Sequence, residues 1–186
     1  MIRVMVVDDH PAMRTGLNSV LRREPGMVVC ALAADGAEAI DAVDHDPDVA
    51  LVDYHLAGED GIALCQRLKK QHLELRVLLY SAHARQGLAL PARLAGADGV
   101  LDKGAPANDL LEAIRTVARG ESVFPETAPE LVRVGRSRIS ERDLPLLGML
   151  ADGANPDEVS LVMHLEPGEV KARVERLLEM LKPRIG

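Results

Sequence analysis

The sequence has 186 residues, a formal net charge of -7, 47% hydrophobic residues and 27% charged residues. These values match a globular protein of one large or two small domains, and they exclude fibrous and intrinsically disordered chains. Aromatic residues are only 2% of the chain, and residues 1–120 and 139–186 are each net acidic, which argues against stacking on single-stranded nucleic acid and against nonspecific binding to nucleic acid or membranes.

The cysteines and the apolar segments indicate the compartment. Cys30 and Cys65 are too few for a disulfide framework, and both lie in apolar runs where a buried thiol is usual. Asp8 and Asp9 follow the N-terminus too soon for a signal-peptide core, and no apolar run approaches the roughly 20 residues of a membrane span. We therefore expect a cytoplasmic protein without a membrane part.

Residues 1–119 predict five strand and helix units. The apolar run at residues 2–7 predicts a buried strand, and a helix that begins at Pro11 is stopped by Pro25 and Gly26. The alternation recurs four times, with strands expected at 27–33, 48–53, 75–81 and 98–102 and helices at 36–45, 60–70, 84–97 and 107–120. Because parallel strands need crossover connections, the predicted fold class is α/β, a doubly wound parallel sheet with helices on both faces. Pro91 lies inside the fourth helical segment, so we expect that helix to be short, broken or displaced.

A second, all-α region follows a linker. Residues 120–138 combine Pro, Gly, Ser and charges and predict a linker with one short helix at residues 129–134. Residues 139–186 predict three helices, of which the first begins at Ser140 and is stopped by Gly153. The predicted organisation is therefore a domain at 1–119, a linker at 120–138 and a helical domain at 139–186.

Polar residues follow four of the predicted strands. Asp8 and Asp9 end the first strand, Asp53 the third and Ser81 the fourth, and Lys103 follows the fifth. The carboxyl ends of parallel strands meet at one edge, so these side chains are expected to converge there. Each acid alone is as easily explained by loop and helix-cap roles, but the joint occurrence after four strands favours a site.

This combination of residues predicts phosphoryl chemistry. Three neighbouring carboxylates repel one another, a cost that a hard cation such as Mg2+ removes by binding their oxygens. Asp53 can then act as a nucleophile toward phosphorus, with Lys103 and the Ser81 hydroxyl stabilising the phosphoryl oxygens. The product would be an acyl phosphate.

Four motifs resemble the receiver domain of two-component response regulators, which has a flavodoxin-like (βα)5 fold. They are VVDDHP at residues 6–11, VDYHLAGEDG at 52–61, YSA at 80–82 and LDK at 101–103. The resemblance implies that a sensor histidine kinase phosphorylates Asp53 and that the protein is not an enzyme beyond self-phosphorylation and self-dephosphorylation. It further implies that Mg2+ is held by Asp8, Asp9, Asp53 and the backbone carbonyl of His55, with Ser81, Lys103 and the small Ala82 around the phosphoryl group.

Two positions depart from this family. Val100 stands where members commonly have an aromatic switch residue, and Gly104 follows Lys103 where they usually have proline. Switching by aromatic rotation is therefore not expected.

His55 and His83 lie next to Asp53 and Ser81, so a role in dephosphorylation and a role as ordinary loop histidines both remain open. The other histidines, His10 among them, show no metal-ligand spacing.

Residues 139–181 resemble the LuxR-type helix-turn-helix (HTH) that follows receivers in the NarL/FixJ subfamily. The apolar frame of three helices is kept, but the predicted recognition helix carries Glu166 and Glu169, and Lys171 and Arg173 are its best candidates for contacts to DNA. Asp157 takes a position that is commonly lysine. The fourth helix of this family, which mediates dimerisation, is expected to be absent, so any homodimer would form through the receiver.

Two functions remain open. The first is a phosphorylation-dependent transcription regulator, in which the added charge on Asp53 changes dimerisation or releases the HTH. The alternative is a signalling adaptor whose HTH-like domain binds protein and has lost DNA binding, which the acidic helix and Val100 favour. A Mg2+-dependent phosphohydrolase is disfavoured because His55 stands where a second catalytic acid would be needed.

Overall fold

The computed structural model describes residues 1–84, 87–125 and 139–181. The short helix predicted at residues 129–134 lies outside these ranges. Within them, no helix combines the length and the apolarity needed to cross a membrane.

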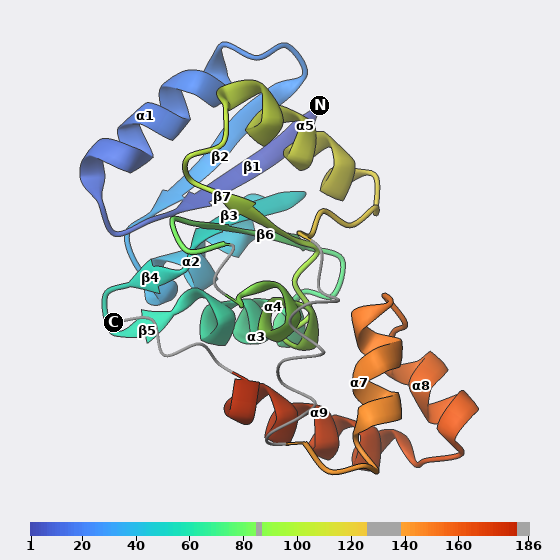
Figure 1. The fold of residues 1–186 in the computed structure, drawn as a ribbon. Coiled ribbons are helices and arrows are strands. Elements are labelled where there is room, and N and C mark those ends of the chain that lie inside the picture. Colours follow the sequence, from blue (N-terminus) through green and yellow to red (C-terminus); the bar gives the residue numbers. More distant parts are fainter. Residues whose placement is uncertain (85–86, 126–138, 182–186) are drawn as a thin grey trace.

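The core of the fold is a parallel sheet of five strands in the order β2-β1-β3-β6-β7 (Figure 1). The strands are β1 (Ile2–Val7), β2 (Met27–Ala33), β3 (Val49–Asp53), β6 (Arg76–Ser81) and β7 (Gly99–Asp102). A short antiparallel hairpin, β4 (His55–Leu56) with β5 (Glu59–Asp60), follows β3 directly. The predicted α/β fold class is confirmed.

Helices cover both faces of the sheet, as the strand pattern requires (Figure 1). They are α1 (Pro11–Arg22), α2 (Gly36–Ala42) followed by the 3-10 helix η1 (Val43–His45), α3 (Gly61–Gln71), α4 (Ala89–Leu94) and α5 (Ala107–Ala118). Alternate residues of β1 belong to different cores: Val4 and Val6 pack with α1 and α5, whereas Met5 and Val7 pack with α2, α3 and α4. This period of two places apolar side chains on both faces of a buried strand.

Helix α4 is short, as the sequence predicts. It spans six residues, and Pro91 is its third residue. The first turn of a helix leaves its N–H groups without helical partners, so a proline there costs no hydrogen bond. Starting the helix at Ala89 therefore accommodates Pro91, which would break a longer helix.

Three helices, α7 (Leu144–Ala151), α8 (Pro156–Met163) and α9 (Pro167–Leu181), form the C-terminal region. The predicted start of the first helix at Ser140 is wrong: α7 begins at Leu144, and Ser140 instead donates a hydrogen bond from Oγ to Asp143 Oδ2 (2.8 Å). A helix from Ser140 would place Pro145 in its interior, whereas the observed start places it in the first turn. Helix α8 is fixed by a capping box between Asn155 and Glu158.

The C-terminal helices share a core with the sheet domain. Helix α4 contacts both α7 and α9. Buried residues of α4, such as Leu90 and Leu94, belong to the same apolar cluster as Leu147, Val174 and Leu177. Apolar contacts therefore join the two regions that the predicted linker connects.

Candidate functional site

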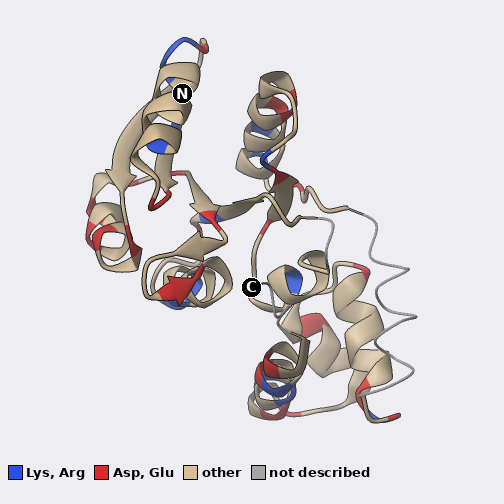
Figure 2. Ribbon diagram, turned by 60° about the vertical axis from the view of Figure 1, so that its left-hand side comes forward, with Lys and Arg blue, Asp and Glu red and all other residues tan. Residues whose placement is uncertain are grey.

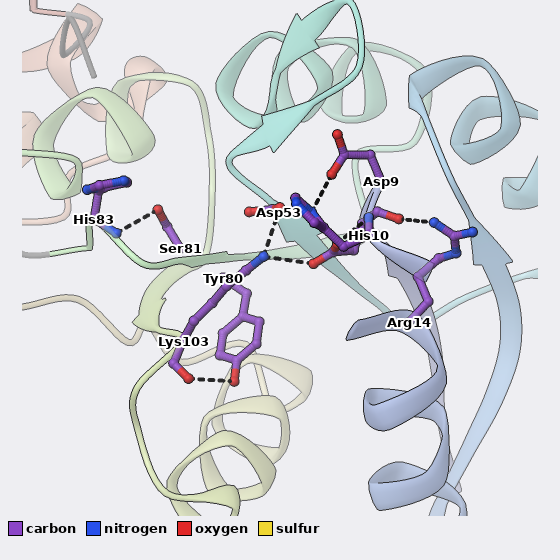
Figure 3. A network of polar contacts seen from close by, with 9 residues as sticks. Asp9, His10, Arg14, Asp53, Tyr80, Ser81, His83 and Lys103 are labelled. Atoms are coloured by element: carbon purple, nitrogen blue, oxygen red, sulfur yellow. Dashed lines mark hydrogen bonds and ion pairs between the residues drawn. The ribbon is translucent and has the colours of Figure 1, made fainter. Parts of the chain in front are cut away.

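The residues predicted to converge do lie together, at the carboxyl edge of the sheet. Asp8 follows β1, Asp53 and Ser81 end β3 and β6, and Lys103 follows β7. In the sheet, β1 pairs with β3, β3 with β6 and β6 with β7, so four adjacent strands deliver these side chains to one place. Figure 3 shows the Lys103 side chain extending to Asp53, with Ser81 beside His83.

The centre of the site is the Lys103 ammonium. Its Nζ lies 2.8 Å from Asp8 Oδ2 and 2.8 Å from Asp53 Oδ2. Both carboxylates are buried, with side chains 2% and 4% exposed, and the lysine side chain is 15% exposed. Two buried carboxylates thus share one cation, so the site remains net negative.

Burial and the contacts between the two groups shift the pKa values of Asp53 and Lys103. Burial raises the pKa of Asp53, against the opposing effect of the Lys103 hydrogen bond and charge. Burial lowers the pKa of Lys103, but hydrogen bonds and charges from Asp53 and Asp8 outweigh it, and the net direction is upward. Lys103 therefore stays charged, and ionisation of Asp53 costs more than it would in water because the carboxyl group is buried.

The chain around Asp53 packs tightly. The backbone N–H of His55 donates to the Asp53 carboxylate, and Gly61 N–H donates to the Tyr54 carbonyl (2.7 Å). A Cβ on Gly61 would lie 2.4 Å from the Asp53 carbonyl oxygen, so only glycine fits at the start of α3. Gly58 forms the hairpin turn with φ +90°, a conformation that favours glycine.

An acidic cluster that could hold a cation extends from these residues. One ligand atom from each of Asp8, Asp9, His10 and Asp53 lies within 4.8 Å of the others. Asp9 Oδ1 is buried and accepts no hydrogen bond. Clustered carboxylate oxygens are the donors that a hard divalent cation such as Mg2+ prefers, so the residues fit such an ion. The role of the His55 carbonyl in this set stays a prediction.

Around Ser81 the structure places the remaining predicted residues. Ser81 is fully buried, and its Oγ accepts a hydrogen bond from His83 N–H (3.0 Å), which leaves the hydroxyl hydrogen for another acceptor. Ala82 is exposed. Val100 is buried in the core on the α4 side of the sheet. The His55 and His83 rings meet edge to face with centroids 5.5 Å apart, and His83 Nδ1 is buried without a hydrogen-bond partner.

Two residues near the site were missed by the sequence analysis. Tyr80 is buried, its hydroxyl donates to the Lys103 carbonyl (3.3 Å), and its ring centroid lies 6.0 Å from Lys103 Nζ. Its position next to Ser81 in a chain with three aromatic residues could have drawn attention to it. His10 belongs to the acidic cluster, although its sequence spacing indicated no metal ligand.

The predicted DNA contacts on α9 differ in accessibility. Lys171 is exposed. Arg173 is 17% exposed and held by two acids: its Nη1 lies 3.5 Å from Asp143 Oδ1 and its Nη2 lies 2.5 Å from Glu169 Oε1. Figure 2 shows acidic and basic segments mixed along this helix. As placed here, Arg173 holds α9 to the segment before α7.

The fold agrees with comparisons to known proteins. Residues 4–115 match the family model of the response regulator receiver domain. The nitrate/nitrite response regulator protein NarP of Escherichia coli (strain K12) is 33% identical over 98% of this chain and 89% of its own length. The "Probable transcriptional regulatory protein NarL" of Mycobacterium tuberculosis (strain CDC 1551 / Oshkosh) is 33% identical over 97% of this chain and 88% of its own. The solved signal receiver domain of NarL from Mycobacterium tuberculosis is 36% identical, with a TM-score of 0.61 over 64% of this chain and 98% of that one.

The raised pKa of Asp53 predicts a pH-dependent effect on stability. In EDTA at pH 7 we expect Asp53→Asn to raise the free energy of unfolding by roughly 1 kcal/mol, because it removes an unfavourably buried charge. A raised carboxyl pKa stabilises the fold below the unfolded pKa, and this contribution is lost as the pH rises through the folded pKa. The gain from Asn should therefore vanish as the pH falls through the pKa of Asp53.

The measurement is urea unfolding at several pH values. Asp41→Asn, at an exposed position of α2, is the matched control and should leave stability unchanged. An Asp53→Asn variant less stable than the wild type at pH 7 would contradict the proposed balance of charge.

Proposed function

The chain belongs to the response regulators of the NarL/FixJ type, and from this premise we propose that it is a transcription regulator switched by phosphorylation of Asp53. The observation that carries the proposal is the buried ammonium of Lys103 between Asp8 and Asp53. Such an arrangement places a carboxylate nucleophile beside an ammonium group that can also stabilise the phosphorylated product. The proposed organisation is a receiver at residues 1–119, a linker at 120–138 and an HTH output domain at 139–186.

Phosphorylation would proceed by transfer from a phosphohistidine of a sensor histidine kinase. An Asp53 carboxylate oxygen attacks phosphorus, the P–N bond of the donor breaks, and its imidazole leaves with the electron pair and takes up a proton. Asp8, Asp9, Asp53 and the His55 carbonyl would hold Mg2+, which supplies charge neutralisation for the incoming phosphoryl group. Lys103 can pair with a phosphoryl oxygen, and the free hydrogen of Ser81 can be donated to another.

A route for the signal leads from Ser81 through α4. Ser81 ends β6, which pairs with β7, and α4 contacts β7, α7 and α9. Movement of Ser81 toward a phosphoryl oxygen would shift this end of the sheet under α4 and so change the packing of the C-terminal helices. Lys171 and Arg173 are the proposed DNA contacts, and a homodimer would form through the receiver.

A signalling adaptor that binds protein is the second candidate. The exposed residues of α9 include the acids Glu169, Glu175 and Glu179 beside the bases Lys171 and Arg176. DNA recognition gains much of its affinity from basic contacts to phosphates, so this surface, together with the pairing of Arg173, favours a protein partner. Binding experiments with DNA decide between the two.

We first predict the chemistry of Asp53. Incubation with an acyl-phosphate donor and Mg2+ should add one phosphoryl group, detected by intact mass, and Asp53→Asn should abolish the addition. Lys103→Met should slow it about 100-fold, as loss of one charged stabilising group does in comparable sites. Lys70→Met, at an exposed position of α3, is the matched control. Phosphorylation of Asp53→Asn at the wild-type rate would refute the assignment.

The second prediction concerns DNA. The phosphorylated protein should bind a few genomic DNA fragments with an affinity that falls steeply with salt. Lys171→Gln should weaken this binding several-fold and reduce the salt slope, whereas Asp53→Asn should show no response to the donor. If the phosphorylated wild type, verified by mass, binds no fragment at low salt, the adaptor function replaces transcription regulation.

The third prediction concerns Glu169. Its removal as Glu169→Gln takes a negative charge from α9 and releases one carboxylate from Arg173, so DNA binding at low salt should strengthen roughly fivefold. Glu74→Gln makes the same charge change at an exposed position before β6 and should have no effect. Equal effects of the two variants would mean that net charge alone, and not the α9 surface, governs binding.

A further inference from the structure

Arg93 places a poorly compensated cation where the sheet domain meets the C-terminal helices. It is the fifth residue of α4, which contacts both α7 and α9. Its guanidinium carbon lies 3.8 Å from the centroid of the Phe124 ring, and its Nε is buried without a hydrogen-bond partner. Burial lowers the pKa of Arg93, against the attraction of Asp152. A buried N–H without an acceptor is costly, so an anion at this place would stabilise the guanidinium.

The other half-buried arginines are paired. Within the residues that the structure describes, each of them donates a guanidinium N–H to an oxygen of the protein: Arg3, Arg14, Arg76, Arg115 and Arg173. In the same part of the chain, Nε of Arg93 is the one guanidinium nitrogen that is buried without an acceptor. The chain thus satisfies its half-buried arginines elsewhere and leaves this one incomplete.

Arg93 lines a cavity between the sheet domain and the C-terminal helices. The cavity has a volume of about 450 Å³, within the range of roughly 300–1,000 Å³ that small-molecule sites occupy. Apolar residues line it from both sides, with Leu94, Ala97 and Phe124 in the sheet domain and Leu150, Ala154 and Val174 in the C-terminal helices. A ligand in this cavity would therefore contact both regions through apolar side chains.

The polar side of the cavity carries more cations than carboxylates. Arg76 also lines it, and its Nη1 lies 3.1 Å from Asp98 Oδ1. The other oxygen, Asp98 Oδ2, lies 2.6 Å from Lys69 Nζ and accepts a hydrogen bond from Val77 N–H (2.8 Å). One carboxylate thus serves two cations before Arg93 is counted. In a chain with a net charge of -7, such a concentration of cations favours an anionic ligand.

We propose that this cavity binds a small aromatic carboxylate, whose carboxylate group pairs with the Arg93 guanidinium and whose ring packs between the apolar walls. The planar guanidinium offers parallel N–H donors that match the two oxygens of a carboxylate. The Phe124 ring, which stacks on Arg93, provides an aromatic surface beside this pair. Because the ligand would contact both walls at once, its binding would stabilise the packing of the C-terminal helices on α4. The inference does not depend on phosphorylation of Asp53.

The test titrates the full chain with benzoate, salicylate and phenylacetate and follows the backbone amide signals by NMR. At least one of these carboxylates should bind at millimolar concentration or below. The signals of Leu94 and Ala154, which lie on opposite walls, should then shift together. The neutral amide of the same acid should bind about tenfold more weakly, because it lacks the charge that pairs with Arg93.

The variant Arg93→Gln separates recognition of the charge from binding of the ring. It should weaken binding of the carboxylate about tenfold and leave the affinity for the amide nearly unchanged. Arg23→Gln removes the same charge at an exposed position after α1 and should change neither affinity. A thermal melt verifies folding, and Arg93→Lys, which keeps the charge without the planar donors, replaces Arg93→Gln if the latter does not fold. The inference is overturned if none of the carboxylates shifts the signals of both walls, if wild type binds acid and amide equally, or if Arg93→Gln keeps the preference for the acid.

Discussion

The structure depends on one buried interaction, the sharing of the Lys103 ammonium by Asp8 and Asp53. Burying charge is costly unless it is paired, and here one cation serves two carboxylates while Asp9 adds a third nearby. Burial raises the pKa of Asp53 against the opposing effect of Lys103, and the excess of carboxylates over cations accounts for the fit to a divalent cation. The parallel order of four adjacent strands is what makes this concentration of charge unavoidable.

The position of Lys103 is controlled by its strand neighbours more than by its own loop. Its N–H donates to the Ser81 carbonyl (3.0 Å), and its carbonyl accepts from the Tyr80 hydroxyl (3.3 Å). Lys103 and the end of β6 are therefore coupled through backbone contacts, although Gly104 makes the following loop permissive. Tyr80 packs in the core on the α1 and α5 side, whereas Val100 packs on the α4 side. The aromatic residue next to this site thus lies on the opposite face of the sheet from Val100.

The sequence was sufficient to predict the features that follow from the spacing of apolar residues and from the parallel order of the strands. Apolar runs located the five strands, the parallel order placed Asp8, Asp53, Ser81 and Lys103 at one edge, and Pro91 announced a short α4. The sequence was insufficient to predict contacts that depend on where a side chain points in the folded protein. The contact of His10 with Asp9 depends on the N-cap conformation of α1, and the pairing of Arg173 with Asp143 depends on how α9 crosses the segment before α7. Neither follows from spacing along the chain.

The start of α7 at Leu144 could have been predicted from Pro145. Proline is tolerated in the first turn of a helix but not in its interior, and this restriction is stronger than the preference for a serine cap.

The C-terminal helices α7 and α9 cover the side of α4 that faces away from the sheet. Buried apolar residues of α4 and of the C-terminal helices form one cluster, so one side of α4 faces the sheet domain and the other faces α7 and α9. Separating the C-terminal helices would expose apolar surface on both partners, at about 25 cal/mol for each Å². A change at Ser81 must therefore either reorient α9 while this contact is kept, or offer the uncovered α4 another apolar surface. In this arrangement Lys171 is accessible on the exposed side of α9 and Arg173 is paired, so under the proposed function Glu169 and Asp143 would limit how basic the DNA-binding surface can become.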